Sequence, residues 1–232
     1  MTGVAQVKEE GMITNPVYHE LVRLKIINPG TLKRISDRTC DQDIPVYLDT
    51  TSRVIFLGRY ETSEQYESQK RPDREEDKAI VHFMNGATVK TRALENHLRR
   101  YKHFRHLVGD KKLCDFGCGH GYFLDLAKQV TDQLSGVELR ESCRKHLGTT
   151  EPTFDIRKSL DAFEDRFDVV TLFHGLEHLQ HQSLVLRQIR EKLNSNGLII
   201  VEVPHARDFR LQWADLAEFR AFTFRSEHLI LH

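Results

Sequence analysis

The sequence predicts an α/β protein with a mostly parallel sheet, and three observations lead to that prediction. A short apolar run that ends at Asp115 is followed by a glycine-rich turn and then by an amphipathic segment. After this turn, β-rich runs alternate with helical patterns as far as residue 204. The run 169–173 is largely apolar, as in a strand that is covered on both faces. Alternation of this kind is typical of parallel sheets whose crossovers are helices.

The composition predicts one α/β domain with a modest extension, and 232 residues are enough for both. We expect the extension at 1–87 and the domain at 88–232. Lys and Arg together number 34, as do Asp and Glu, so no charge footprint points to nucleic acid or to an anionic membrane. No apolar run approaches the roughly 20 residues of a membrane span, and the first ten residues lack the apolar core of a secretion signal. The four cysteines stand at positions 40, 114, 118 and 143. Their spacing favours neither a metal site nor a disulfide, so we expect a reduced, cytoplasmic protein without a metal.

Two features are predicted in the extension. Residues 1–16 are polar and without pattern, and we expect a mobile arm there; the segment that follows could be a strand or a short helix. Two β-rich runs within 45–57 flank the turn residues 49–52, which predicts a β-hairpin. The highly charged stretch 62–78 is interpreted as a linker or a solvated helix end.

Apolar residues recur at helical spacing over 88–108, which predicts a helix leading into the glycine-rich segment. Its basic residues are interpreted as a solvated face, and these are Arg99, Arg100, Lys102 and Arg105. After the glycines, strands are predicted at 134–138, 153–157, 169–173 and 197–204. A helix is predicted before the last strand, ending at the polar turn 194–197.

The glycine turn has the pattern Asp115-x-Gly117-x-Gly119-x-Gly121. A strand, a glycine turn and a helix together let backbone N–H groups and a helix N-terminus meet a cofactor at close range. The dinucleotide fingerprint Gly-x-Gly-x-x-Gly does not fit, because its third glycine would fall on Tyr122. A purely structural turn is the alternative.

This pattern resembles the first motif of the Rossmann-like, class I S-adenosylmethionine-dependent methyltransferases. Phe-Asp-Val-Val at 167–170 with Leu-Glu-His at 176–178, and later Gly197 and Pro204, resemble the family's later motifs in the right order. The resemblance covers roughly 90 to 205. It implies a doubly wound sheet with helices on both faces and S-adenosyl-L-methionine as cofactor.

The resemblance also implies a set of cofactor contacts. Glu138, at the end of the predicted second strand, would bind the ribose hydroxyls, whereas its alternative is an ordinary surface Glu. The glycines would approach the methionine part, with Asp115 acting near the same end. The full set comprises Asp115, Phe116, Gly117, Cys118, Gly119, Gly121, Glu138, Leu139 and Leu160 (beside adenine), and Phe173 and His174 (beside the sulfonium).

The residues after 203 are similar to a narrower branch that methylates sugars or nucleotide-linked sugars. In that branch a Glu-His pair after the fifth strand lies near the transferred methyl, and the corresponding pair here is Glu227-His228. Proton removal would therefore involve His178, Glu227 or His228, with the Glu tuning the basicity of the His that follows it. Glu177 and His178 could equally well cap the helix that follows.

Two departures from that branch are visible. Its N-terminal module often binds zinc through cysteines, but only Cys40 lies in this region. The chain also stops at residue 232, before the sixth and seventh strands of the usual sheet, so we expect a C-terminally truncated domain. The uncovered strand edge at 198–203 would be able to pair with another chain, and that chain could be a second copy of this one in a homo-oligomer. The apolar segment 209–231 is expected to pack against the sheet or a second subunit.

The sequence therefore predicts a methyltransferase that acts on a small-molecule acceptor, with a sugar favoured. The alternative is a catalytically incomplete cofactor-binding fragment or subunit that acts as a partner protein. Both predict cofactor binding, and only the first predicts turnover. O-, C- and N-methylation all stay open.

Overall fold

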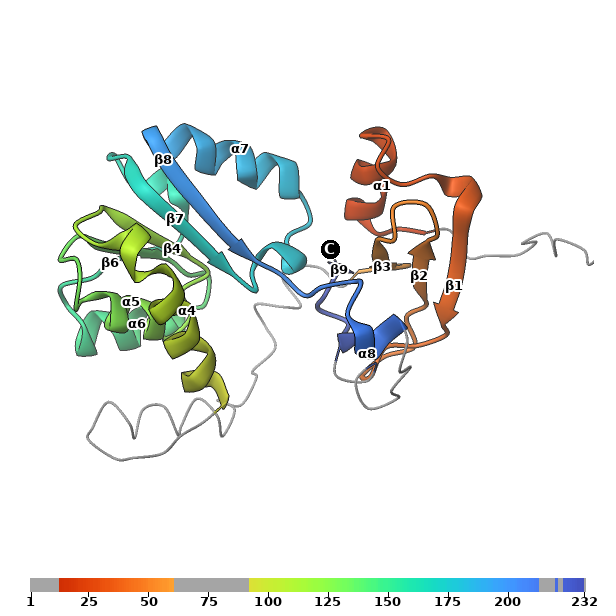
Figure 1. Cartoon of the computed structure of the whole chain (residues 1–232), viewed down its shortest axis with the longest axis horizontal. Helices are drawn as coiled ribbons and strands as arrows, with labels where there is room; N and C mark the ends of the chain where they lie inside the picture. Colours follow the sequence, from red (N-terminus) through yellow and green to blue (C-terminus); the bar gives the residue numbers. More distant parts are fainter. Residues whose placement is uncertain (1–12, 61–91, 213–219, 221–222, 232) are drawn as a thin grey trace, which may run out of the picture. The chain divides into compact units, whose positions relative to one another are not determined.

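The structure is a computed structural model that describes residues 13–60, 92–212, 220 and 223–231. The chain divides into two compact units (Figure 1). We call them the parallel unit (63–175 and 183–202) and the antiparallel unit (1–62, 176–182 and 203–232). None of the helices within the described stretches is long and apolar enough to cross a bilayer.

The parallel unit contains a five-stranded sheet in the order β6-β5-β4-β7-β8. All four strand pairs are parallel. The strands are β4 (Leu113–Phe116), β5 (Leu134–Val137), β6 (Asp155–Arg157), β7 (Phe167–Phe173) and β8 (Leu193–Glu202). From the central β4 the chain moves outward through β5 to β6, then returns to the other side of β4 for β7 and β8. This doubly wound order confirms the predicted fold class.

Helices cover both faces of this sheet. They are α4 (Arg92–Val108), α5 (Tyr122–Ala127), α6 (Glu141–Thr150), the 3₁₀ turn η2 (Leu160–Ala162) and α7 (Gln182–Lys192). Crossovers between parallel strands are right-handed, and those through α5 and α7 run in opposite directions, so these helices lie on opposite faces (Figure 1). Tyr101 and Val108 of α4 share one buried cluster with Phe123 and Leu124 of α5 and with Leu113 of β4.

The start of β8 differs from the prediction, which placed a turn at 194–197 and the strand after it. Phe167 is opposite Leu193, and Val169 is opposite Leu198. Five residues of β8 thus advance against two of β7, so the polar residues 194–197 form a bulge within the strand. The bulge requires a glycine, because a Cβ at Gly197 would lie 2.9 Å from the Leu193 side chain.

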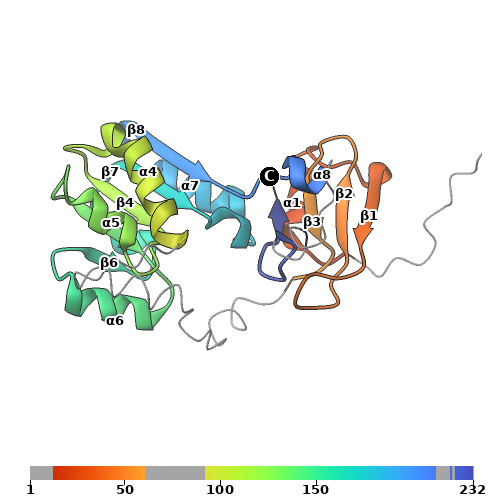
Figure 2. The same cartoon turned by 60° about the horizontal axis from the view of Figure 1, so that its bottom comes forward.

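The antiparallel unit contains a four-stranded antiparallel sheet in the order β1-β2-β3-β9 (Figure 2). Its strands are β1 (Leu32–Ser36), β2 (Val46–Asp49), β3 (Ile55–Leu57) and β9 (Ile230–Leu231). Its helical segments are α1 (Pro16–Arg23), η1 (Pro29–Thr31), η3 (Leu176–His178) and α8 (Phe209–Gln212). β2 and β3 form the predicted hairpin. Burial acts to raise the pKa of Asp49 in its turn, but hydrogen bonds from Ser52 and Thr31 outweigh burial and hold the pKa at about 2.

Both ends of the chain build this unit, so the units do not follow the expected boundary at residue 87. Ile230 and Leu231 of β9 pair with β3, and Leu211 and Phe224 join the buried cluster of β2 and β3. The described apolar residues of 209–231 therefore pack mainly on the antiparallel sheet, although Phe209 is 67% exposed. Trp213, Leu216, Phe219 and Phe222, like the stretch 62–78, lie outside the described residues.

The expectation of a mobile arm over 1–16 is wrong for its last residues. Asn15 is fully buried and caps α1, accepting a hydrogen bond from the Val17 backbone N–H at 2.9 Å. Its Nδ2 donates to the backbone oxygens of Leu57 and Leu229, both at 2.8 Å. One side chain thus ties α1 to β3 and to the segment that leads into β9.

We predict that Asn15→Ala destabilises the protein by about 3 kcal/mol, because it removes the helix cap and takes one hydrogen-bond donor from each of two buried carbonyl oxygens. Urea denaturation measures the change. The control is Asn28→Ala, since Asn28 also caps a helical turn but is exposed, and we expect a loss below about 1 kcal/mol. Equal losses in the two variants would contradict the anchoring role of Asn15.

Candidate functional site

The parallel sheet has a topological switch point between β4 and β7, where the winding direction reverses. In open α/β sheets, ligands bind outside the carboxyl ends of the strands at this point. Asp115 of β4 is paired with Thr171 of β7, and the Thr171 hydroxyl donates to the Asp115 Oδ1 at 2.7 Å. Burial raises the pKa of Asp115 to about 6, although the Thr171 hydrogen bond and the charge of Arg100 act in the opposite direction.

The glycine turn follows β4 at this edge. Gly117, Gly119 and Gly121 have φ values of +81°, +56° and +75°, in the left-handed region that favours glycine. A Cβ at Gly117 would meet nothing within 4 Å, and one at Gly119 would meet only Arg140, at 3.4 Å. A Cβ at Gly121 would lie 2.7 Å from the Leu147 side chain. The first two glycines therefore keep space open. The third, which precedes α5, allows the start of that helix to pack closely against Leu147 of α6.

Glu138, directly after β5, is fixed beside this turn. Its Oε2 accepts a hydrogen bond from the Gly119 backbone N–H at 2.8 Å, and its Oε1 accepts from the backbone N and Nε of Arg140, at 2.8 and 3.1 Å. Only 7% of Glu138 is exposed, so the alternative of an ordinary surface Glu does not hold. The two oxygens of a carboxylate can accept about four hydrogen bonds, so these three leave capacity for a ligand hydroxyl.

The remaining predicted cofactor contacts also lie in the parallel unit, in different environments. Leu139 is 43% exposed, whereas Leu160 is 4% exposed and offers little surface. The Cys118 side chain is buried against Gly136, so its backbone rather than its thiol belongs to the turn. Phe116 is partly buried at the end of β4.

Phe173 and His174 stand at the carboxyl end of β7. The Phe173 ring contacts Phe104 and Phe123, with centroids at 5.9 and 4.8 Å, and the Arg100 guanidinium lies 5.0 Å from its centroid. His174 has a φ of +53°, a strained value for a residue with a Cβ, and such strain persists only where the surroundings enforce it. Its backbone N–H donates to the Glu202 backbone oxygen at 2.8 Å.

Sequence reasoning missed a second carboxylate at this edge, Glu202 at the end of β8. It accepts hydrogen bonds from Arg99 at 2.7 and 2.8 Å and from Arg100 at 2.7 and 3.0 Å, and the His174 Nε2 lies 3.3 Å away. Burial acts to raise the pKa of Glu202, but the hydrogen bonds from His174, Arg100 and Arg99 lower it far below the usual range. The interpretation of the basic residues of α4 as a solvated face is wrong for Arg100, which is 6% exposed. The sequence did contain a signal for Glu202: like Glu138, it is a carboxylate near the carboxyl end of a predicted strand.

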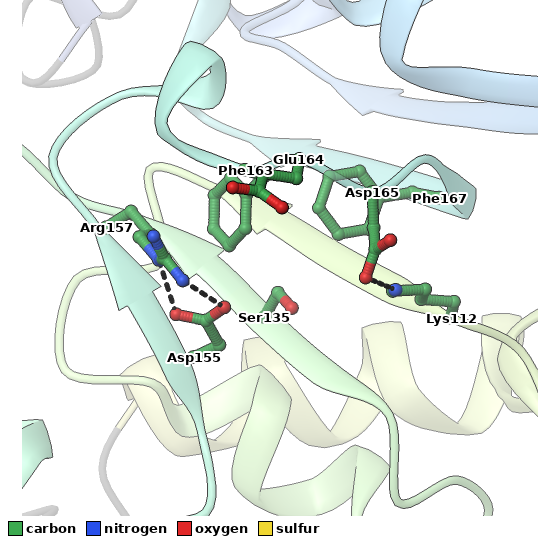
Figure 3. A pocket seen from close by; sticks show the side chains of 8 residues that line it. All are labelled: Lys112, Ser135, Asp155, Arg157, Phe163, Glu164, Asp165 and Phe167. Atoms are coloured by element: carbon green, nitrogen blue, oxygen red, sulfur yellow. Dashed lines mark hydrogen bonds and ion pairs between the residues drawn. The ribbon is translucent and has the colours of Figure 1, made fainter.

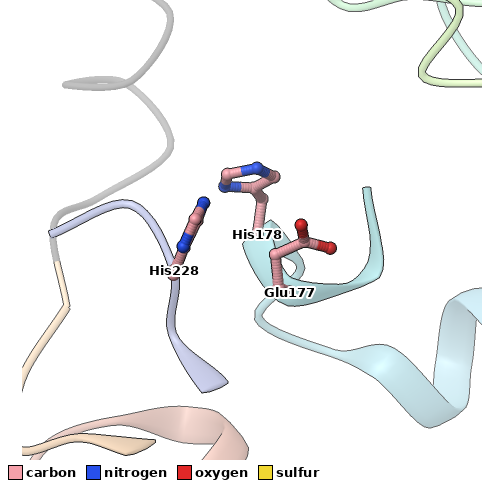
Figure 4. Close-up of side chains that lie close together, drawn as sticks. All are labelled: Glu177, His178 and His228. Atoms are coloured by element: carbon pink, nitrogen blue, oxygen red, sulfur yellow. The ribbon is translucent and has the colours of Figure 1, made fainter. Parts of the chain in front are cut away.

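The predicted catalytic residues lie in the antiparallel unit, where the fold brings them together. The rings of His178 and His228 lie 5.1 Å apart between centroids at an angle of 60° (Figure 4). The His178 Nδ1 lies 2.7 Å from the Glu227 backbone oxygen, and the His228 Nδ1 lies 3.1 Å from the Thr223 backbone oxygen. A carbonyl oxygen only accepts, so both Nδ1 atoms carry the proton.

The carboxylate that influences His228 is not the one predicted. The Glu227 side chain pairs with Arg225 at 3.0 Å. Burial and the neighbouring His178 lower the pKa of His228 to about 4, while the charge of Glu177 acts to raise it. Glu177, for which a helix cap was the alternative, is fully buried beside the two histidines (Figure 4).

A cavity of about 320 Å³ lies at the other end of the parallel sheet (Figure 3). Residues at or near the starts of the strands line it, and they include the ion pairs Lys112–Asp165 and Arg157–Asp155. Because ligands of open α/β sheets bind at the carboxyl ends of the strands, we assign no cofactor to this cavity.

A family model described as a methyltransferase domain matches residues 89–231, which is more than half of the chain. The chain therefore belongs to the methyltransferase domain family, and the family expected from the sequence is confirmed.

Individual relatives agree with this membership. A probable S-adenosylmethionine-dependent methyltransferase of Mycolicibacterium smegmatis is 28% identical over 113 residues, covering 47% of this chain and 44% of that protein. Another of the same description, from Mycobacterium tuberculosis, is 28% identical over 103 residues, covering 43% and 38%. The chain thus matches less than half the length of these curated relatives.

Among solved structures, a methyltransferase from Archaeoglobus fulgidus has a TM-score of 0.40 and 27% identity, covering 47% of this chain and 52% of that one. DesVI of Streptomyces venezuelae has a TM-score of 0.42 and 20% identity, covering 54% and 56%.

The buried Asp115 carboxyl predicts how stability depends on pH. Its pKa in the folded protein, about 6, is above the usual value of about 3.9. The contribution of this group to stability is therefore fully present below pH 4 and is lost as the pH rises through 6. We predict that Asp115→Asn, which keeps an acceptor for Thr171, stabilises the protein at pH 7.5 by up to roughly 3 kcal/mol and that this gain disappears near pH 4.

Urea denaturation across this pH range measures the difference. Asp168→Asn is the comparison, because hydrogen bonds from the Lys112 backbone and Asn194 lower the pKa of Asp168. That variant should lose stability at neutral pH, and the loss should shrink as the pH falls. A destabilised Asp115→Asn protein at pH 7.5 would contradict the prediction.

Proposed function

We propose that the chain binds S-adenosylmethionine across the carboxyl ends of β4, β5 and β7 and transfers its methyl group to a small-molecule acceptor. One observation carries this proposal. The glycine turn keeps space open at Gly117 and Gly119, and the Gly119 N–H donates to the buried Glu138 carboxylate at the same edge of the sheet. An open turn beside a fixed carboxylate matches a ligand with a compact polar end and a ribose.

The residues at this edge fit the cofactor part by part. Gly117 and Gly119 allow close backbone approach to the methionine portion. Glu138 keeps acceptor capacity for a ribose hydroxyl, and the exposed Leu139 offers apolar surface to adenine. Phe173 provides an aromatic surface at the neighbouring strand end. When bound, the cofactor supplies a methyl group activated by the positive charge on sulfur.

Proton removal from the acceptor is proposed for the histidine cluster of the antiparallel unit. A general base works best when its pKa lies near the operating pH. His228, with a pKa of about 4, is a weak base, and the Glu227 carboxylate is already paired with Arg225. Of the three predicted residues, His178 is therefore our first candidate.

A sugar or a nucleotide-linked sugar is the acceptor we favour, on the resemblance of the segments at 203–208 and 219–229 to sugar methyltransferases. The test incubates the protein with S-adenosylmethionine and a panel of nucleotide sugars and follows each acceptor by mass spectrometry. A gain of one methyl group supports the proposal. Cofactor binding without turnover on any acceptor would instead support the partner-protein alternative.

We predict that Glu138→Ala weakens S-adenosylhomocysteine binding at least tenfold. The variant removes charge-assisted hydrogen bonds, each worth about 1.5–3 kcal/mol. Isothermal titration calorimetry measures the affinity. The control is Glu141→Ala, because Glu141 is exposed on α6 and pairs with Lys145. Unchanged affinity in Glu138→Ala would show that the ribose site is misplaced.

We also predict that Gly119→Val abolishes cofactor binding while the protein still folds. A β-branched side chain would fill the open space and strain a backbone with φ of +56°. Circular dichroism checks folding and calorimetry checks binding. Gly148→Val is the matched control, because Gly148 is exposed on α6 and a Cβ there meets nothing within 4 Å. A folded Gly119→Val protein that binds normally would count against the assignment of the glycine motif.

A further inference from the structure

Three potential metal ligands meet in the antiparallel unit, in the cluster formed by Glu177, His178 and His228. One ligand atom from each of these side chains lies within 4.8 Å of the others. Glu177 and His178 come from η3, whereas His228 comes from the segment before β9, and the three side chains lie close together in Figure 4. Residues 50 positions apart in the sequence are thus placed as one group.

The two imidazoles are oriented as metal-binding imidazoles are. In metal sites, a ligating His almost always donates its other ring N–H to a carbonyl or carboxylate, which fixes the tautomer. Here the Nδ1–H of His178 donates to the Glu227 backbone oxygen, and that of His228 donates to the Thr223 backbone oxygen. The lone pair of each neutral ring is therefore on Nε2.

The backbone that carries these ligands is held in place by bonds within the same unit. The Leu229 N–H donates to the Glu177 backbone oxygen at 2.9 Å, joining the two segments next to the ligands. On the other side, the Ser226 N–H and hydroxyl both donate to the Asp41 carboxylate, at 3.0 and 2.6 Å. Ligands on a fixed backbone lose little conformational entropy when they bind an ion.

The third ligand supplies negative charge. Glu177 is fully buried in the same cluster as the two imidazoles, and a carboxylate oxygen is a ligand that completes histidine sites for transition metals. A divalent cation at the cluster would place positive charge directly beside the Glu177 carboxylate.

We propose that Glu177, His178 and His228 bind one divalent transition-metal ion. Two imidazole nitrogens and one carboxylate form a ligand set used by Zn²⁺ with a further position left open, whereas Mg²⁺ and Ca²⁺ prefer oxygen ligands. Ligands about 2.1 Å from a tetrahedral zinc ion are on the order of 3.4 Å apart. The three ligand atoms, which lie within 4.8 Å of one another, would have to approach by up to about 1.4 Å to bind one ion.

This site goes beyond the proposed methyl transfer and revises the expectation of no metal, which considered only the cysteines. It also constrains the mechanism. An Nε2 that ligates a metal cannot at the same time accept a proton, so metal binding and a general-base role for His178 or His228 exclude one another. The binding test needs neither cofactor nor acceptor, so failure to bind zinc and failure to transfer a methyl group are distinguishable. Stoichiometric zinc binding at the cluster would rule out His178 as the base proposed above and leave cofactor binding and methyl transfer untouched.

The experiment titrates the chelator-treated full chain with Zn²⁺ by calorimetry at pH 7.5, with Mg²⁺ in a parallel titration. Co²⁺ serves as a spectroscopic probe, because its visible absorption distinguishes a low-coordinate nitrogen and oxygen site from hydrated ions. We expect one Zn²⁺ per chain, intense Co²⁺ absorption bands and no detectable binding of Mg²⁺. Absence of stoichiometric Zn²⁺ binding by the wild-type chain would overturn the proposal without any variant.

Variants then assign the ligands. His178→Ala, His228→Ala and Glu177→Gln should each weaken Zn²⁺ binding at least tenfold and remove the Co²⁺ bands. His181→Ala is the matched control, because His181 is exposed in the same unit and should change neither readout. Circular dichroism confirms that each variant is folded. Unchanged binding in both folded histidine variants, or loss of binding in His181→Ala, would place any bound zinc elsewhere.

Discussion

The parallel unit depends on the way the turn after β4 is tied to the end of β5. The backbone N–H groups of Gly117 and Cys118 both donate to the Val137 oxygen, at 2.8 and 3.0 Å, and the Gly119 N–H donates to the Glu138 carboxylate. These bonds give acceptors to backbone N–H groups that would otherwise have none where the strand ends. Two of the three donors, Gly117 and Gly119, have left-handed φ values, which glycine adopts at no steric cost. The same bonds therefore join two strands, orient the carboxylate and keep the loop open.

Three strand ends at this edge carry carboxylates, and the fold treats each one differently. Asp115 is buried with a single hydroxyl partner, and its pKa is raised to about 6. Glu138 receives a loop amide and the main chain and guanidinium of Arg140. Glu202 is held by two guanidinium groups, and its pKa is lowered. The edge thus combines one carboxyl that resists ionisation with one that is firmly ionised, and Arg100 links Glu202 to the ring of Phe173.

Local patterns predicted the features that local chemistry determines. The parallel sheet follows from the alternation of strands and helices, and the positive φ values are those that glycine favours. Interactions between distant residues left no such pattern. The bond of Asn15 to Leu229, the pairing of Arg100 with Glu202 and the addition of β9 to the first hairpin all join segments about one hundred residues apart or more. The sequence around Arg100 alone suggests a solvated side chain. Arg100 is buried because it donates hydrogen bonds to Glu202 at the end of β8. For Glu177 the sequence suggested only a helix cap, as an alternative shared with His178, because the histidine that lies beside it in the fold is 51 residues further along the chain.

The antiparallel core contains residues from distant parts of the chain, which explains why the sequence does not predict this unit. Val46 and Leu57 come from the first hairpin, but Ala206, Leu211 and Phe224 of the same buried cluster follow β8. The segment that follows β8 therefore supplies part of a core that the strands β2 and β3 begin. In open α/β folds, the segments after the strand ends carry much of the ligand specificity. Here those segments also hold His178 and His228, so the positions of these imidazoles depend on packing with the N-terminal hairpin. Substitutions in that hairpin can thus alter the histidine cluster without contacting it, and the N-terminal region acts as the support of that cluster.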